Sequence, residues 1–570
     1  MKVLLTAINA KYIHSNLAVY SLSKYVSDRG IDTDIAEYTI NQNIDEILSD
    51  IYLRKPDILA FSCYLWNIEY VSNLITEIKK ILPKVIIWLG GPEVSYNSKE
   101  VLTDYPFVKG IVCGEGEESL RQVLSHYISG DVKLEEISGV SFYNDKGEII
   151  TNPITQIMDL SNAPFVYDNM KQFEHKIIYY ESSRGCPFNC SYCLSSVDKR
   201  LRFRNIDLVK EELLKLIEAE VPQVKFVDRT FNCKHDHAYD IWKFINDNDK
   251  GITNFHFEVS ADLLNEKELE LMKTMRPGLI QLEIGVQSTN PDTIKEIHRT
   301  MNFEKVSENV NKIHSWGNIH QHLDLIAGLP FEDYESFKNS FNDVYTLCPE
   351  QLQMGFLKVL KGSYMYDHVK DYELLYQDRP PFEVLSTKWL PYSDVIRLKQ
   401  IEDMVEVHYN SGQFECTIKE LEKSFDNAFD MYEKLALFYE KKGYDKVNHS
   451  RISRYEILYD FIKEYADNNV EDLRQLLVID LYLRDNVKNR PDFAGELTVS
   501  KDETSRIYEL ESEEHKYLEG YDSYDKRQIR KMTHLERYKD KILLFDYKNR
   551  NILNNQAKVI VVDNNVSCKK

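Results

Sequence analysis

Short apolar runs alternate with amphipathic stretches over the first 130 or so residues of the chain. The runs predict buried β-strands, and the stretches between them carry the three-to-four-residue spacing of helices. The predicted strands cover residues 2–8, 34–38, 57–64, 85–89 and 110–113. Strand–helix alternation predicts a parallel sheet covered on both faces, and five strands in this length favour a flavodoxin-like order.

The same alternation returns after a connector, which contains a predicted hairpin at 139–150. Six further strands are predicted at 176–180, 223–227, 254–258, 279–284, 320–326 and 351–358. Six β/α units favour a partial, TIM-like (β/α)6 barrel, whose functional groups gather at the carboxyl ends of its strands. The remaining chain is mostly helical, with a short β hairpin predicted at 541–547 and 557–563. The predicted α/β architecture therefore has domains at 1–135, 172–380 and 381–570, with a connector at 136–171.

Three cysteines with the spacing CxxxCxxC follow the first predicted barrel strand: Cys186, Cys190 and Cys193. Thiolates are soft ligands that suit iron–sulfur irons, and three of them leave one iron of a [4Fe–4S] cube without a protein ligand. A structural zinc site would need a fourth ligand, and no CxxC or HxxxH partner lies at zinc-finger distance. Three buried core thiols would leave unexplained both the spacing and the aromatic Tyr192 before the last cysteine.

Composition narrows the environment in which this chemistry takes place. The chain has 570 residues, a formal net charge of −21 and nine cysteines. This charge disfavours a broad nucleic-acid interface, and the absence of a run of 18 apolar residues argues against a membrane span. An odd number of dispersed cysteines and an N-terminus that starts with a strand pattern, not a signal peptide, predict a reducing, cytoplasmic location.

The cysteine spacing, with Tyr192 directly before Cys193, resembles the signature of the radical S-adenosylmethionine (SAM) superfamily. This resemblance implies that the open iron binds the amino and carboxylate groups of SAM. Reductive cleavage of SAM then gives a 5′-deoxyadenosyl radical, with a reductant such as a flavodoxin or ferredoxin as partner. The protein's part is to position the cofactors and exclude water.

The same resemblance assigns residues at the barrel strand ends to SAM. Asp228 is expected to accept from the SAM amine and Arg299 to grip its carboxylate, because a guanidinium binds carboxylates in bidentate fashion. A helix N-cap for Asp228 and a solvated helix charge for Arg299 remain open alternatives. The full predicted SAM set is Asp228, Glu258, Ser260, Glu283, Gly285, Gln287, Arg299 and Gly328.

Glycine-rich loops at the strand ends of the first domain, GGPE at 90–93 and GEGE at 114–117, resemble those of the cobalamin-binding domain that precedes many radical SAM methyltransferases. The residues that this resemblance assigns to cobalamin are Ser62, Trp66, Gly90, Gly91, Glu93, Gly114 and Glu115. The chain departs from the classical DxHxxG pattern, whose histidine is the lower axial cobalt ligand. His14 lies on the matching loop at a different spacing, so the axial ligand is left open, as is a degenerate domain that binds nothing.

The predicted function is that of a radical SAM enzyme, with cobalamin-dependent methylation of an unactivated carbon as the expected reaction. The substrate is expected to be a small molecule or a peptide, and no catalytic side chain is assigned beyond the cluster. Two alternatives remain: a cobalamin-independent radical rearrangement, cyclisation or oxidation, and a non-catalytic Fe–S or corrinoid carrier.

Overall fold

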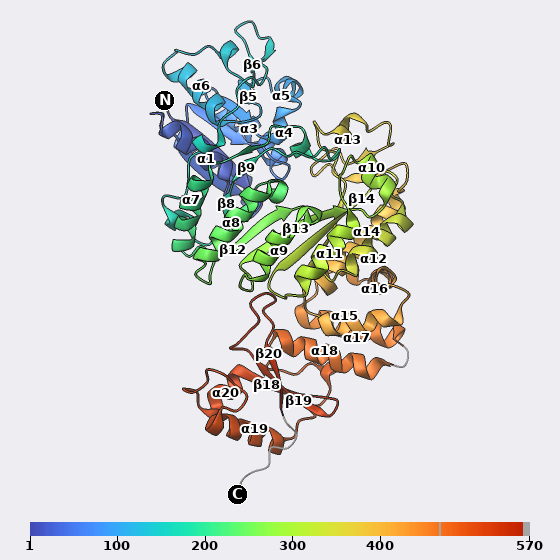
Figure 1. Ribbon diagram of the computed structural model, residues 1–570. Coiled ribbons are helices and arrows are strands. Elements are labelled where there is room, and N and C mark those ends of the chain that lie inside the picture. The colour runs from blue at the N-terminus through green and yellow to red at the C-terminus, as the bar shows by residue number, and fades with distance from the viewer. Residues whose placement is uncertain (467–468, 563–570) are drawn as a thin grey trace. The chain divides into compact units, whose positions relative to one another are not determined.

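The computed structural model describes residues 1–466 and 469–562 (Figure 1), so the end of the predicted strand at 557–563 lies outside the described residues. The chain separates into two compact units. The first unit contains residues 1–313, 326–333 and 355–392. The second contains residues 314–325, 334–354 and the chain from residue 393 onward.

The first unit opens with a seven-stranded sheet in the order β2-β1-β3-β4-β5-β6-β7. Strands β1 to β5 are parallel, in the flavodoxin-like order that the sequence predicts. The hairpin of the predicted connector forms β6 and β7, which extend this sheet antiparallel to β5. The bounds are β1 Val3–Asn9, β2 Asp34–Thr39, β3 Ile58–Ser62, β4 Ile86–Gly90, β5 Gly110–Val112, β6 Val140–Tyr143 and β7 Ile149–Thr151.

Both faces of this sheet are covered by helices, as a buried parallel sheet requires. Alternate residues of β1 enter different cores: Leu4 and Ile8 pack with α2 and α3, whereas Val3 and Leu5 pack with α1 and α6. This period of two explains why β1 reads as a continuous apolar run. The helices are α1 Leu17–Ser27, α2 Ile44–Arg54, α3 Ile68–Ile81, α4 Pro92–Ser95, α5 Ser98–Asp104 and α6 Glu117–Ile128.

Six barrel strands then alternate with helices, as predicted: β8 Ile178–Tyr180, β11 Gln223–Phe226, β12 Asn254–Val259, β13 Ile280–Gln287, β14 His320–Ala327 and β15 Gln351–Phe356. Within the first unit, β8, β11, β12 and β13 are parallel neighbours. The intervening helices are α7 Ile206–Glu218, α8 His235–Asn248, α9 Glu266–Lys273, α10 Pro291–Glu296, α11 Phe303–His314 and α12 Tyr334–Tyr345. The first unit also contains the short β9 Ser183–Arg184, β10 Arg202–Phe203, α13 Tyr364–Asp367, β16 Leu375–Tyr376 and β17 Val384–Ser386.

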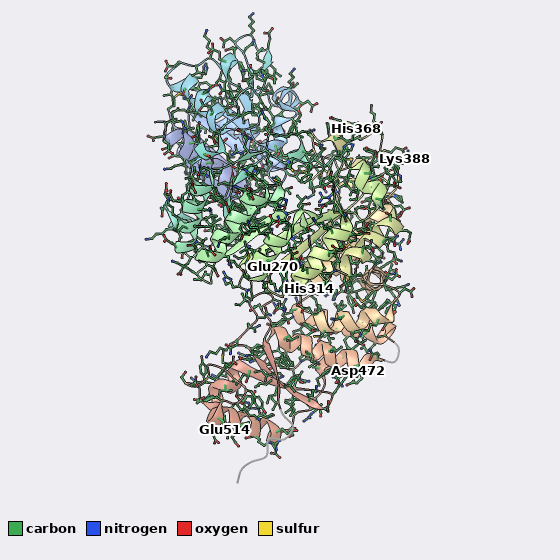
Figure 2. All side chains as sticks on the ribbon, in the orientation of Figure 1. Glu270, His314, His368, Lys388, Asp472 and Glu514 are labelled. Atoms are coloured by element: carbon green, nitrogen blue, oxygen red, sulfur yellow. The ribbon has the colours of Figure 1, made fainter. Side chains whose placement is uncertain are left out.

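The C-terminal part of the second unit is helical and ends in a three-stranded antiparallel sheet, one strand more than predicted. Asp480 is buried and accepts the backbone N–H groups of Cys416 and Thr417 at 3.0 and 2.8 Å, so its carboxylate caps α15. Exposed charges such as Asp472 lie on the outer surface (Figure 2). The elements are α14 Tyr392–Val405, α15 Glu415–Leu421, α16 Ala428–Lys442, α17 Arg451–Tyr465, α18 Val470–Arg484, α19 Lys501–Glu514, α20 Lys526–Met532, β18 Thr533–Tyr538, β19 Lys541–Asp546 and β20 Lys558–Val562. Among the described residues, no helix combines the length and the apolar character needed to cross a lipid bilayer.

Candidate functional site

The loop with the three cysteines is closed at its base by a short antiparallel ladder. Arg184 of β9 pairs with Arg202 of β10, and the loop between them carries all three thiols. Cys186 and Cys190 are each 8% exposed. Burial raises the pKa of the Cys186 thiol, and the neighbouring Cys193 and Cys190 raise it further. Cys193 and Cys190 therefore both lie near the Cys186 thiol, as ligands of one cluster must.

The donor set suits an iron–sulfur cluster. Cysteine thiolates are the usual ligands of [4Fe–4S] clusters, and all three thiols lie on the one loop between β9 and β10. Cys186, Cys190 and Cys193 are thus the residues that would hold a [4Fe–4S] cluster.

Arg299 reaches this loop from beyond α10. Its Nη1 donates to the sulfur of Cys190 at 3.7 Å and to the hydroxyl of Tyr192 at 3.3 Å, and its Nη2 donates to the carbonyl of Gly285. Burial would lower the pKa of Arg299, but Tyr192 and Cys190 beside it raise that pKa, so the guanidinium keeps its charge. Its buried Nε has no partner among the described residues, which fits a further acceptor close to the thiols. The structure therefore places Arg299 beside the cluster loop, a contact that the sequence did not predict.

Asp228 follows β11 and is 1% exposed. Its carboxylate accepts the N–H and hydroxyl of Ser182 at 3.0 and 2.7 Å, and the hydroxyl of Ser183 at 2.5 Å. Burial raises the pKa of Asp228 to about 6, although these hydrogen bonds lower it. Both oxygens are engaged in holding the segment that enters the cluster loop, so a contact with the SAM amine stays a prediction.

Three polar side chains on neighbouring barrel strands contact one another. Glu283 of β13 accepts from His256 of β12 at 2.8 Å and from Lys225 of β11 at 3.1 Å. Burial would raise the pKa of Glu283, but the hydrogen bond from His256 and the charge of Lys225 outweigh it and lower that pKa to about 2. Glu283 is therefore a fixed carboxylate, and its neighbours Lys225 and His256 were not singled out by the sequence.

The remaining predicted SAM residues take several positions. Glu258 lies 3.9 Å from Arg229 in an ion pair, and the hydroxyl of Ser260 donates to Asp262 at 2.7 Å. Gln287 has a positive φ of 73°, and its amide lies so close to Gly285 that a Cβ there would clash at 2.2 Å. Gly328 has φ of 88°, with a Cβ position 2.8 Å from Val384. The positive φ of Gly328 favours glycine there, whereas at Gly285 an added Cβ would meet only the movable end of the Gln287 side chain.

A cavity of about 1340 Å³ opens at the carboxyl ends of the first sheet. This volume exceeds the roughly 300–1,000 Å³ of ordinary small-molecule sites, so it suits a large cofactor or two ligands together. Six of the seven residues predicted to contact cobalamin line it: Ser62, Trp66, Gly90, Gly91, Gly114 and Glu115. The seventh, Glu93, is buried in α4 and does not line the cavity, and burial raises its pKa.

The cavity wall contains a stacked pair of aromatic rings and a glycine whose backbone is exposed to a ligand. Trp66 stacks on Tyr64 at 4.5 Å between ring centroids and donates its indole N–H to the carbonyl of Ile8 at 3.0 Å. Gly91 has φ of 110°, and a Cβ there would lie 2.4 Å from the carbonyl oxygen of Cys63. The backbone can therefore approach a ligand closely at this strand end.

His14 also lines the cavity, and its Nδ1 lies 2.6 Å from the hydroxyl of Tyr179. Burial lowers the pKa of His14, and the charges of Lys11 and Lys225 lower it further. A neutral imidazole hydrogen-bonded to Tyr179 is thus what the cavity contains in place of the DxHxxG histidine. Whether it ligates cobalt stays a prediction.

The same cavity continues to the barrel. Tyr179, Lys225, Arg229 and Glu258 line it from the carboxyl half of the barrel strands, and Gly185 lines it directly before Cys186. One continuous cavity therefore connects the glycine-rich loops of the first sheet with the loop that carries the thiols.

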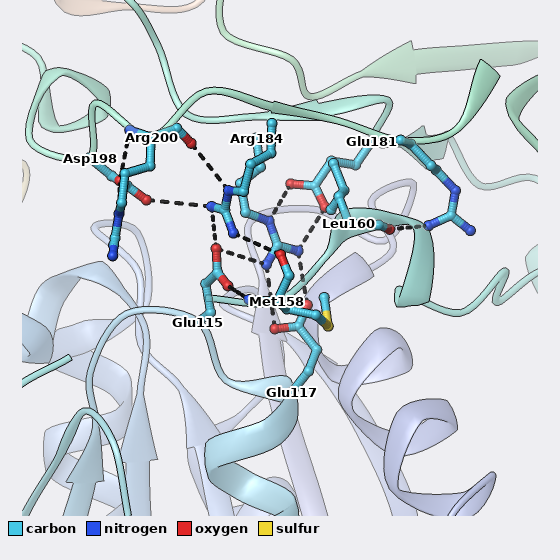
Figure 3. Close-up of polar contacts among 10 residues, drawn as sticks. Glu115, Glu117, Met158, Leu160, Glu181, Arg184, Asp198 and Arg200 are labelled. Atoms are coloured by element: carbon cyan, nitrogen blue, oxygen red, sulfur yellow. Dashed lines mark hydrogen bonds and ion pairs between the residues drawn. The ribbon is translucent and has the colours of Figure 1, made fainter. Parts of the chain in front are cut away.

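Ion pairs join the two sides of this cavity near the cluster loop (Figure 3). Arg184 contacts Glu117 at 2.8 Å and Glu181 at 2.8 Å, and it lies 3.6 Å from Glu115. Glu115 is also paired with Arg202. Glu115 was predicted to contact cobalamin; the structure engages it in this charged network at the cavity wall.

A flavodoxin-like sheet facing a partial barrel, with three thiols at the first barrel strand end, defines a radical SAM protein with a cobalamin-binding-type domain. Comparison with family models agrees: residues 3–124 match the B12 binding domain, 180–344 the Radical SAM superfamily, and 370–562 a protein of unknown function (DUF4080). The chain thus belongs to the radical SAM superfamily, with an N-terminal B12-binding domain and a C-terminal domain of unknown function. These matches confirm the predicted domain types and, with them, the [4Fe–4S], SAM and cobalamin cofactors that the domains use.

Among curated proteins, the chain is 24% identical over 315 residues to a 2-(S-pantetheinyl)-carbapenam-3-carboxylate methyltransferase from Streptantibioticus cattleyicolor, covering 51% of this chain and 45% of that protein. It is 20% identical over 313 residues to an anaerobic magnesium-protoporphyrin IX monomethyl ester cyclase from Rubrivivax gelatinosus, covering 52% and 55%. The chain therefore spans about half the length of these curated relatives. Among solved structures, OxsB, a cobalamin-dependent S-adenosylmethionine radical enzyme with aqua-cobalamin bound, gives a TM-score of 0.61 at 16% identity, covering 84% of this chain and 80% of that one. At this identity the likeness supports the fold alone.

Proposed function

We propose that this protein is a cobalamin-dependent radical SAM methyltransferase that methylates an unactivated carbon of a small-molecule or peptide substrate. The observation that carries the proposal is the single cavity of about 1340 Å³ shared by the B12-binding domain and the cluster loop. A methyl donor and a radical generator must reach the same carbon, so their sites must open into one space.

When bound, the cluster would supply the electron that cleaves SAM, and cobalamin would supply the methyl group. The residues of the chain hold and orient these groups. Cys186, Cys190 and Cys193 would hold the cluster, and Arg299 donates to the sulfur of Cys190. Gly91 has no side chain, so the backbone at this strand end would let the corrin approach closely.

The barrel side of the cavity favours a substrate with polar groups. The side chain of Lys225 is 30% exposed at the cavity, and Glu283 fixes its ammonium group at 3.1 Å. Arg229, with a side chain 56% exposed, lies on the same side with Glu258 at 3.9 Å. These charges can orient a substrate through hydrogen bonds, while the hydroxyl of Tyr179 is held by His14.

We infer that the electron comes from a one-electron carrier such as a flavodoxin or ferredoxin. The dispersed cysteines and a cluster that needs reduction suit a cytoplasmic location.

The experiment uses anaerobically purified, reconstituted protein with cobalamin, SAM and a chemical reductant. Methyl transfer converts SAM to S-adenosylhomocysteine, whereas radical cleavage gives 5′-deoxyadenosine. The proposal expects both products, with S-adenosylhomocysteine dependent on added cobalamin. Cys186→Ala should abolish 5′-deoxyadenosine, whereas the matched variant Cys348→Ala, which removes an exposed cysteine, should leave it unchanged. Formation of neither product would contradict the proposal and favour a non-catalytic Fe–S or corrinoid carrier.

A radical cyclisation or rearrangement is the second candidate, and the similarity to the anaerobic cyclase favours it. It uses the same cluster and SAM residues and transfers no methyl group. It expects 5′-deoxyadenosine without S-adenosylhomocysteine, so the same product analysis separates the two functions.

A further inference from the structure

Two acidic residues of the B12-binding domain face two arginines at the base of the cluster loop. Glu115 and Glu117 belong to the GEGE segment, which follows β5 and begins α6. Arg184 and Arg202 are directly paired across the β9–β10 ladder. Residues directly opposite each other in an antiparallel ladder place their side chains on one face, so both guanidinium groups point the same way.

These four residues form ion pairs, and the pair of Arg184 with Glu117 is forked (Figure 3). Arg184 donates to both carboxylate oxygens of Glu117, at 2.8 and 3.4 Å, and lies 3.6 Å from Glu115. Arg202 pairs with Glu115, and the other oxygen of Glu115 accepts the backbone N–H of Met158 at 3.2 Å. Forked contacts of this kind fix orientation as well as distance.

These ion pairs are largely removed from solvent. The side chains of Arg184, Glu117, Arg202 and Glu115 are 21%, 6%, 17% and 19% exposed. Exposed ion pairs contribute little to stability. Removing one partner of a buried pair is destabilising, because it leaves the other charge buried without compensation. Moving the GEGE segment away from the cluster loop would therefore be strongly unfavourable, and the two must move together.

Three of these four residues, Glu115, Glu117 and Arg184, also form part of the cavity wall. Gly114 and Glu115 line it from the first sheet, and Arg184 and Gly185 line it from the cluster loop. Gly185 has φ of 94° and a Cβ position 2.8 Å from the carbonyl oxygen of Arg200, so the step from Arg184 to Cys186 is tightly packed. A ligand that shifts the GEGE segment must therefore also shift the first cluster thiol.

We propose that Glu115, Glu117, Arg184 and Arg202 form a clamp that couples occupancy of the cobalamin site to SAM binding at the cluster. The four are positioning residues: they act through the GEGE segment and Cys186. Because coupling is reciprocal, cobalamin changes the affinity for SAM by the same factor as SAM changes the affinity for cobalamin. The inference rests on the proposed function only in requiring that both ligands bind.

The test measures the dissociation constant of SAM on cluster-loaded protein, with and without cobalamin, by the change that SAM causes in the electron paramagnetic resonance spectrum of the reduced cluster. Glu117→Gln removes one negative charge of the clamp and leaves the residues of the cluster loop unchanged. Arg202→Gln removes one positive charge on the cluster-loop side of the clamp. Lys176→Gln is the matched control, because Lys176 and Glu37 form another ion pair between first sheet and barrel, at 2.6 Å with both side chains 12% exposed. Iron content and circular dichroism verify that each variant is folded and carries the cluster. Arg202→Lys is the substitute variant if Glu117→Gln does not take up the cluster.

The clamp predicts that cobalamin changes the SAM dissociation constant of the unaltered protein at least about five-fold, the lower end of typical couplings. Glu117→Gln and Arg202→Gln should reduce this ratio below about two-fold, and Lys176→Gln should retain it, as should Arg202→Lys in part. A ratio near one in the unaltered protein, an unchanged ratio in Glu117→Gln, or an equal loss in Lys176→Gln would each overturn the clamp. Failure to bind cobalamin at all would overturn the clamp and the proposed function together. Formation of S-adenosylhomocysteine without coupling would overturn the clamp alone.

Discussion

Replacing Arg299 by Gln should lower the reduction potential of the cluster. The Arg299 guanidinium lies 3.7 Å from the sulfur of Cys190, and reduction would add one negative charge to the cluster that this sulfur would hold. Removing the nearby positive charge destabilises the reduced state, so the potential should become more negative. Gln keeps hydrogen-bonding capacity toward Tyr192 and Gly285, so the change removes mainly charge.

The magnitude follows from the distance between the Arg299 guanidinium and the Cys190 sulfur. At an effective dielectric constant of about 20, two unit charges 3.7 Å apart interact by about 4.5 kcal/mol. The added electron is spread over the cube, so its mean distance from the guanidinium is roughly twice as large and the interaction falls to about 2 kcal/mol. At 59 mV for each factor of ten, this corresponds to a shift of about 100 mV.

The assay is a redox titration of the reconstituted cluster followed by electron paramagnetic resonance. Arg299→Lys keeps the charge and should shift the potential by less than about 30 mV, because the Coulomb term is retained. Tyr192→Phe removes only the hydroxyl that accepts from Arg299 and should also have a small effect. An Arg299→Gln potential within the error of the unaltered protein, at equal iron content, would refute the electrostatic role.

Three further predictions test separate parts of the structure. Gly91→Ala should weaken cobalamin binding at least about ten-fold in an absorbance titration, since strain of 1–3 kcal/mol is typical of such backbone positions. Gly147 also has a positive φ, but its Cβ position is open, so Gly147→Ala should leave cobalamin binding unchanged. Equal losses of cobalamin affinity in the two variants would argue against the close approach at Gly91. Asp228→Asn should remove one component from the pH dependence of the apoprotein's unfolding free energy. The native pKa of Asp228, about 6, lies above the ordinary 3.8, so the contribution of this carboxyl is greatest below pH 4 and falls by about 3 kcal/mol toward pH 6. An identical pH dependence in Asp228→Asn and the unaltered protein would contradict this assignment. Arg204→Gln breaks a pair with Glu212 at 2.6 Å, with side chains 5% and 3% exposed, and should lower stability in urea unfolding by about 3–5 kcal/mol; a loss below 1 kcal/mol would show that the charge is not buried.

The arrangement of strands could be predicted because it depends on local pattern. The apolar runs at 2–8 and 110–113 became β1 and β5, and all six barrel strands appeared within a few residues of their predicted bounds. The hairpin at 139–150 was also predicted, but its partner was not, because nothing within it specifies that β6 pairs with β5. The third strand of the C-terminal sheet was missed as well, since β18 follows α20 without a turn signal.

The side-chain partners of the site could be predicted only in part. The spacing of Cys186, Cys190 and Cys193 places three thiols on one loop, so their proximity follows from the sequence. The sequence assigned Glu115 to cobalamin. Its ion pair with Arg202 joins residues 87 positions apart, so the sequence around neither residue predicts it. Arg299 likewise contacts Cys190 from a distant segment, and only the packed structure could show that contact.

The central claim is that the B12-binding domain and the cluster loop serve one reaction space. Gly114 of the first sheet and Gly185 of the cluster loop line one cavity, so cofactors bound on its two sides lie close together. The direct measurement is the magnetic coupling between paramagnetic cobalt and the reduced cluster in protein loaded with both. A resolved dipolar interaction between the two centres would agree with the shared cavity. Two independent signals, with no coupling in fully loaded protein, would contradict it.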